Sequence, residues 1–105
     1  MGDERTQQGQ GLVVEEAQPR TKRPPLYQVV LLNDDYTPME FVVDVLEHIF
    51  AKPPAQAMEI MLNVHHNGVG LAGVFAHEVA ESKIDRVHTL ARKAGFPLRC
   101  SLEPE

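Results

Sequence analysis

The stretch LYQVVLLNDDYTPMEFV, positions 26–42, contains an abrupt change of local structure. Residues 26–32 are mostly apolar, include two β-branched valines, and lie between Pro25 and Asn33. Such a short, bounded apolar run predicts a buried strand. Residues 33–36 then favour a turn, because Asn and Asp side chains hydrogen-bond to their own local backbone.

The residues after this turn carry the signals of a helix start. Thr37 is a typical N-cap residue, and Pro38 suits the first helical position. Glu40 stands where its side chain could complete a capping box with Thr37. We therefore expect a helix from Pro38 to about Ala51. Its core face comprises the apolar residues at helical spacing, Val42, Val45, Leu46, Ile49 and Phe50.

Four further elements are predicted after the Pro53–Pro54 pair. In chain order they are a helix at 55–66, a strand at 69–75, a helix at 76–94 and a strand at 97–103. Gly68 and Gly95 follow the two helices as their terminating glycines. The order β-α-α-β-α-β indicates an α+β fold in which three helices cover a small three-stranded antiparallel sheet.

The formal charge of −5 is unevenly distributed along the 105 residues. The first 24 residues are neutral as a segment, because Asp3, Glu4, Glu15 and Glu16 are matched by Arg5, Arg20, Lys22 and Arg23. This polar segment predicts a flexible N-terminal extension at 1–24, followed by one domain at 25–105. The acidic domain repels phosphate backbones and favours cationic ligands, so we expect no nucleic-acid partner.

The single cysteine and the hydropathy pattern bear on the compartment. Cys100 has no second cysteine to pair with, and the sequence contains neither a secretory signal nor an apolar run of about 18 residues. We therefore expect a cytoplasmic protein that does not associate with membranes. Cys100 lies in an alternating segment without an activating neighbour, which favours a buried structural thiol over a nucleophile.

Two histidine motifs are candidates for metal chemistry. His77 and Glu78 begin a phrase similar to the zinc-peptidase signature, but Glu81 stands where the second histidine would be. His65 and His66 are adjacent, so on a helix their side chains diverge by about 100° and do not chelate one ion. We therefore expect no metal and no other cofactor.

The acidic turn acquires a more specific meaning from its sequence context. NDDYTPMEFV is followed, in order and at matching spacing, by MLNVHHNG, GVFAHEVAESK and PLRC. This combination closely resembles the ClpS family of Clp protease adaptors, the recognition component of the N-end rule, over residues 24–103. The resemblance implies a non-enzymatic adaptor. Such an adaptor binds peptides whose first residue is Leu, Phe, Tyr or Trp and delivers these N-degron substrates to a Clp-family AAA+ unfoldase of the ClpA or ClpC type.

The resemblance also implies roles for individual residues. The α-amino group of the peptide would be bound by Asn33, Asp35 and His65, with Asp34 supporting the first residues of the peptide. These side chains suit the task, because an ammonium offers three N–H donors and one positive charge. The apolar specificity pocket would comprise Thr37, Met39, Val42, Met61, Val64 and Leu98.

The unfoldase contact implied by the resemblance lies on the helix at 76–94. Glu78 and Lys83 are its expected residues, and Glu81 is a neighbouring candidate. The residues themselves leave two alternatives open. One is a metalloenzyme built on His77, and the other is a plain interaction domain similar to the C-terminal domain of the ribosomal stalk protein.

Overall fold

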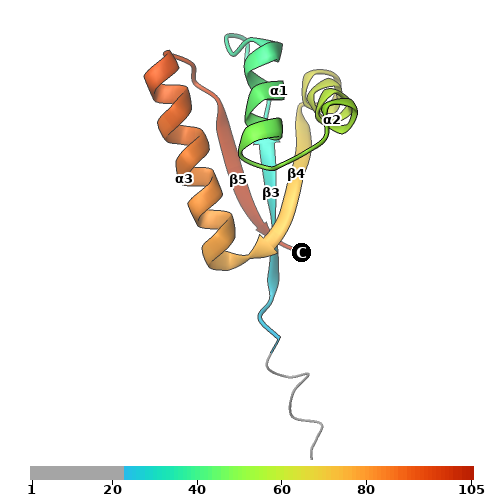
Figure 1. Ribbon diagram of the computed structural model, residues 1–105, viewed down its shortest axis with the longest axis vertical. Helices are drawn as coiled ribbons and strands as arrows, with labels where there is room; N and C mark the ends of the chain where they lie inside the picture. Colours follow the sequence, from blue (N-terminus) through green and yellow to red (C-terminus); the bar gives the residue numbers. More distant parts are fainter. Residues whose placement is uncertain (1–22) are drawn as a thin grey trace, which may run out of the picture.

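The computed structural model describes residues 23–105. The predicted N-terminal extension at 1–24 therefore lies outside the described residues except for its last two. The elements, labelled as in Figure 1, are β3 Leu26–Leu32, α1 Met39–His48, α2 Pro54–Asn67, β4 Val69–Ala76, α3 His77–Ala94 and β5 Arg99–Pro104. This order confirms the predicted β-α-α-β-α-β arrangement.

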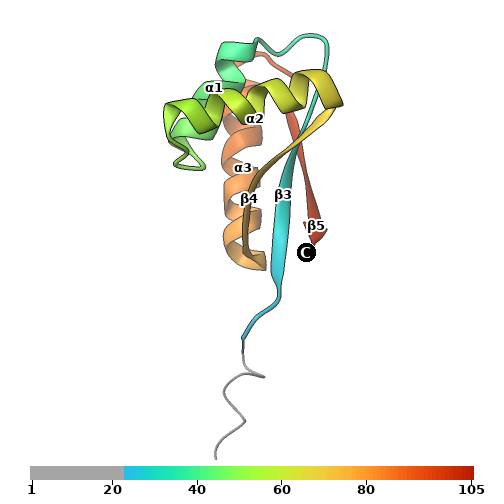
Figure 2. The same cartoon turned by 90° about the vertical axis from the view of Figure 1, so that its right-hand side faces the viewer.

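The sheet has β3 at its centre. Its strand order is β4-β3-β5, and β3 pairs antiparallel with both neighbours. Figures 1 and 2 show that all three helices cover the same face, with α2 running across the end of the sheet where β3 leads into α1. The structure thus confirms the predicted three-stranded antiparallel sheet covered by three helices.

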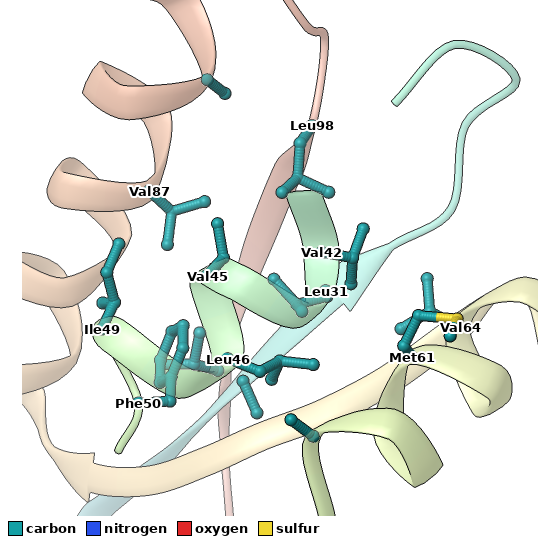
Figure 3. Close-up of a cluster of buried hydrophobic side chains, with 14 of the residues drawn as sticks. Leu31, Val42, Val45, Leu46, Ile49, Phe50, Met61, Val64, Val87 and Leu98 are labelled. Atoms are coloured by element: carbon teal, nitrogen blue, oxygen red, sulfur yellow. The ribbon is translucent and has the colours of Figure 1, made fainter. Parts of the chain in front are cut away.

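The core lies between the sheet and these helices. Alternation along β3 directs Val29 and Leu31 to the helical side, where both are fully buried. They pack with the core face of α1, and Val87 and Ala91 of α3 close the other side. Figure 3 shows this cluster with Val45 and Leu46 between the sheet and the neighbouring helices. The predicted core face of α1 is confirmed, since Val42, Val45, Leu46, Ile49 and Phe50 are all buried.

The predicted capping box at the start of α1 is wrong. The helix begins at Met39, its N-cap is Pro38, and no side chain caps it. The Thr37 hydroxyl instead donates to Asp34 Oδ2 at 2.8 Å, so it is occupied within the preceding turn. The helix also ends at His48, with Ile49 as its C-cap, before the predicted end near Ala51, which itself adopts a left-handed conformation with φ 54°.

Three glycines stand at positions where a side chain would be strained or would clash. Gly68 has φ 89° and Gly95 has φ 83°, which confirms their predicted positions at the ends of α2 and α3. Gly70 serves a different purpose, because a Cβ there would stand 2.6 Å from Val64 Cγ2 and 3.1 Å from the Ile60 carbonyl oxygen. A hydrogen at this position allows α2 to pack closely against β4.

A side chain of α3 links that helix to the edge strand β5. The Cys100 N–H donates to His88 Nε2 at 3.2 Å, which requires a neutral ring with its proton on Nδ1. Partial burial, together with the positive charges of Arg99 and Arg92, lowers the pKa of His88 below its ordinary value of 6.5, against an opposing effect of Asp85. No helix within residues 23–105 combines the length and apolarity needed to cross a membrane.

We predict that the His88 contact makes stability depend on pH. Because folding lowers the pKa of His88, its stabilising contribution is complete above pH 6.5 and is lost as the pH falls through the folded-state pKa. The midpoint of urea unfolding should therefore fall between about pH 7.5 and about pH 5. His88→Gln, whose amide oxygen accepts a hydrogen bond without titrating, should show a shallower fall. Equal slopes for the two proteins would contradict this role.

Candidate functional site

A cavity of about 380 Å³ opens at the end of the sheet where β3 leads into α1. Three segments contribute to it, namely the loop between β3 and α1, the first turns of α1, and the C-terminal half of α2. The lining residues are Asn33, Asp34, Asp35, Tyr36, Thr37, Pro38, Met39, Val42, Met61, Val64 and His65. Its volume lies within the range of about 300–1,000 Å³ that is typical of small-ligand sites.

A backbone contact brings the polar ends of these segments together. The Asn33 N–H donates to the Gly68 carbonyl oxygen at 2.9 Å. Gly68 terminates α2 three residues after His65, so the contact holds the end of β3 against the last turn of α2. Asn33 and His65, far apart in sequence, consequently line one cavity, and the amino-group role that the family resemblance implies for them stays a prediction.

The loop itself is organised by Asp34. Its Oδ1 accepts hydrogen bonds from the Tyr36 N–H at 2.8 Å and the Thr37 N–H at 2.7 Å, and its Oδ2 accepts the Thr37 hydroxyl. Partial burial acts to raise the pKa of Asp34, but the hydrogen bonds from Thr37 and Tyr36 outweigh it and hold that pKa below the ordinary value. The carboxylate of Asp34 therefore shapes the loop from within.

The rim of the cavity is polar and negatively charged. Asn33, Asp35 and His65 are exposed there, and none of the hydrogen bonds within residues 23–105 involves their side chains. The lining contains two aspartates, whereas no Lys or Arg among the described residues contributes to it. Such a rim attracts a cation and leaves acceptors available to it.

The interior of the cavity is apolar. Val42 from α1 and Met61 and Val64 from α2 are almost completely buried, and their side chains form part of the same core cluster. Met39, in the first turn of α1, remains exposed in the same lining. Thr37 lines the cavity through its position in the loop. The cavity thus joins an acidic rim to an apolar interior.

One predicted pocket residue does not lie in this lining. Leu98 is 3% exposed, and Figure 3 shows it pointing into the core cluster that contains Val42. It lines a separate cavity between the end of α3 and β5. Leu98 is thus buried in the core and absent from the lining of this cavity, and its place in the specificity pocket stays a prediction.

Two lining residues were missed by sequence reasoning. Tyr36 is 78% exposed, and Pro38 is half-buried beside Met39. Both belong to the turn that the sequence already singled out. An aromatic residue directly after two aspartates, within a predicted turn, is the signal that could have identified Tyr36.

The predicted unfoldase contacts differ in how free their side chains are. Glu78 is exposed in the first turn of α3. The Lys83 amine donates to the Ile49 carbonyl oxygen at 3.0 Å and lies 5.2 Å from the centroid of the Phe75 ring. Lys83 thus satisfies a carbonyl at the end of α1, a structural role that its sequence position did not indicate.

Other groupings of ionisable residues are sparse. His77 Nδ1 lies 3.6 Å from Glu81 Oε1, one helical turn away. Within residues 23–105, no three His, Cys, Asp or Glu side chains come together in a way that could hold a metal ion. The metalloenzyme alternative therefore has no cluster of ligands in the described part of the chain.

Comparisons with known proteins agree on one family. The family model described as ATP-dependent Clp protease adaptor protein ClpS matches residues 22–101. The ClpS adapter protein of Ruegeria pomeroyi is 55% identical over 105 residues, which are 100% of this chain and 93% of that protein. The ClpS adapter protein of Desulfatibacillum aliphaticivorans is 56% identical over 95 residues, covering 90% of this chain and 91% of that protein.

A solved structure has the same fold. It is the structure of Agrobacterium tumefaciens ClpS2 bound to L-phenylalaninamide, and it superposes with a TM-score of 0.76 at 42% sequence identity. The match covers 79% of this chain and 100% of that one.

We predict that Asp34→Ala loosens the loop, because it removes the acceptor of three hydrogen bonds. The free energy of unfolding should fall by about 1–2 kcal/mol in urea titrations. The Tyr36 and Thr37 amide protons should exchange with solvent at least about tenfold faster in NMR measurements. Asp35→Ala is the matched control, since its carboxylate accepts none of these bonds. Unchanged exchange in Asp34→Ala would show that another group shapes the loop.

Proposed function

Because this chain belongs to the ClpS family of ATP-dependent Clp protease adaptor proteins, we propose that it recognises the first residue of a substrate polypeptide and delivers that substrate to a Clp protease. The family consists of adaptors and not of catalysts. The preferred first residues are Leu, Phe, Tyr and Trp. The observation that carries this proposal is the joining of an acidic rim to an apolar interior within one cavity.

The rim suits a free α-amino group. An ammonium has three N–H donors and one positive charge, so three acceptors of which at least one is anionic satisfy it. The Asn33 amide oxygen, the Asp35 carboxylate and an unprotonated ring nitrogen of His65 supply this set. Asp34 supports the first residues of the peptide indirectly, because its carboxylate holds the loop that carries Asn33 and Asp35.

The interior suits a large apolar side chain that is not branched at Cβ. Met39 and Met61 are flexible and polarisable, so they adapt to a Leu side chain or an aromatic ring. Val42 and Val64 form the remaining apolar walls. The ligand of the solved relative, L-phenylalaninamide, combines a free amino group with a phenyl ring and thus has the chemistry of both halves.

Neither half suffices alone. Burying a large apolar side chain contributes about 1.5–3 kcal/mol, and each charge-assisted hydrogen bond contributes about 1.5–3 kcal/mol. Association costs about 4–15 kcal/mol in lost translational and rotational freedom. A peptide that lacks either the free amino group or the large side chain therefore falls short of useful affinity.

Delivery requires a second surface, which we place at the start of α3. Glu78 is exposed there, and Glu81 stands one turn further along the helix. The partner is a Clp-family AAA+ unfoldase of the ClpA or ClpC type. Lys83 contributes mainly by holding the end of α1, through its bond to the Ile49 carbonyl. The extension at residues 1–24 would act as the segment that the unfoldase engages during delivery.

The proposed recognition predicts a clear order of affinities. Peptides beginning with Phe or Leu should bind, whereas the acetylated Phe-peptide and peptides beginning with Val or Asp should lose at least about 100-fold in affinity. The acetylated peptide lacks the charged amino group, Asp lacks an apolar side chain, and Val offers only a small one that is branched at Cβ. Isothermal titration with all five peptides measures this. Asp35→Ala should weaken the Phe-peptide by about tenfold or more. Equal binding of the free and acetylated Phe-peptides would refute the proposal.

Variants of α3 separate docking from folding. Glu78→Ala should weaken binding to the unfoldase in surface plasmon resonance while leaving the free energy of unfolding within about 0.5 kcal/mol of wild type. Lys83→Ala should cost about 1–3 kcal/mol of stability, because the Ile49 carbonyl loses its donor. Both variants should keep their affinity for the Phe-peptide. A fully stable Lys83→Ala protein would contradict the structural role of this lysine.

A further inference from the structure

The methionines of this protein differ sharply in their accessibility. Met39 is 44% exposed and Met58 is 48% exposed, whereas Met61 is only 6% exposed. Met39 and Met61 both line the cavity, while Met58 lies on α2 outside it. Within residues 23–105, Met39 is therefore the single methionine that both lines the site and is open to solvent.

We propose that Met39 is a site of reversible oxidation by peroxides, and that its conversion to the sulfoxide switches off binding of the substrate's first residue. The inference rests on the proposed function, since it concerns the same cavity. A lone pair of the Met39 sulfur attacks one oxygen of hydrogen peroxide, and the O–O bond breaks. An S–O bond forms, the sulfur loses two electrons, and the peroxide is reduced to water.

The location of Met39 explains why the sulfoxide would oppose binding. A thioether is apolar and polarisable, and it adapts to an incoming apolar side chain. The sulfoxide carries a strong acceptor oxygen that needs a donor once water is excluded. Three other residues of the lining, Val42, Met61 and Val64, are apolar and have no donor, and the Thr37 hydroxyl already donates to Asp34. The polar side chains of Asn33 and His65 belong to the rim, where the proposed function engages them with the amino group of the peptide. A bound Leu or Phe side chain would therefore bury the oxygen without a partner.

The cysteine sulfur is not a comparable target. Cys100 is half-buried on β5, and burial raises the pKa of its thiol to about 12. Peroxides react with the thiolate, which is nearly absent at neutral pH for such a thiol. Cys100 also lies outside the cavity lining. Among the sulfur atoms compared, we therefore expect only oxidation of Met39 to affect peptide binding.

The test compares treated and untreated protein, using a Phe-initiated peptide that contains neither Met nor Cys. The full-length wild type, Met39→Leu and Met58→Leu are each treated with hydrogen peroxide, and mass spectrometry of proteolytic fragments locates the added oxygen. Fluorescence anisotropy then gives the affinity before and after treatment. A treated sample is finally incubated with methionine sulfoxide reductases of both epimer specificities, or with dithiothreitol alone.

We expect treated wild type and treated Met58→Leu to lose about tenfold or more in affinity, and the reductases to restore it. Met58→Leu should match wild type before treatment, because Met58 lies outside the cavity. Met39→Leu should keep whatever affinity it has before treatment. Each of three results would overturn the inference: a protein fully oxidised at Met39 that binds as before, an equal loss in Met39→Leu, or recovery with dithiothreitol alone.

The same experiment distinguishes failure of this inference from failure of the proposed function. If untreated wild type binds the Phe-peptide and the Met39 sulfoxide form binds equally well, only the redox inference fails. If untreated wild type does not bind the peptide, the proposed function and the inference that depends on it fail together.

Discussion

The hydrogen bond from the Asn33 N–H to the Gly68 carbonyl is the contact on which the site depends. It continues the pairing of Leu32 with Val69 by one step beyond the sheet, so that the acidic turn meets the last turn of α2. Two segments more than thirty residues apart in the printed sequence thereby line one cavity. Acceptors from the turn and the ring of His65 consequently share one rim.

Adjacent residues of the same charge have different roles around this contact. The carboxylate of Asp34 is occupied by donors of its own loop, whereas the carboxylate of Asp35 is exposed at the rim. A carboxylate that already accepts three hydrogen bonds has little capacity left to bind a peptide, but it stabilises the conformation of its loop. Two charged residues of α3 differ in the same way. Glu78 is exposed, whereas the Lys83 amine donates to the Ile49 carbonyl.

In the proposed function, the thioethers that adapt the cavity to varied apolar side chains also expose it to oxidation. Thioethers adapt to aliphatic and aromatic partners, yet a thioether at the mouth of an open cavity meets dissolved oxidants as readily as it meets ligands. Met61 escapes this because packing with Val64 and the core covers it. Exposure, rather than residue type, separates the two methionines.

The sequence by itself determined the elements, their order, the core face of α1 and the terminating glycines, because hydrophobic periodicity and glycine conformation are local properties. It also singled out the acidic turn and His65. Only the tertiary structure decided which hydrogen-bond and packing partners individual side chains have. Thr37 bonds to Asp34 instead of capping α1, Leu98 is buried in the core, and Lys83 binds a carbonyl 34 residues away in the chain. Such choices depend on distances between segments, which local patterns do not specify.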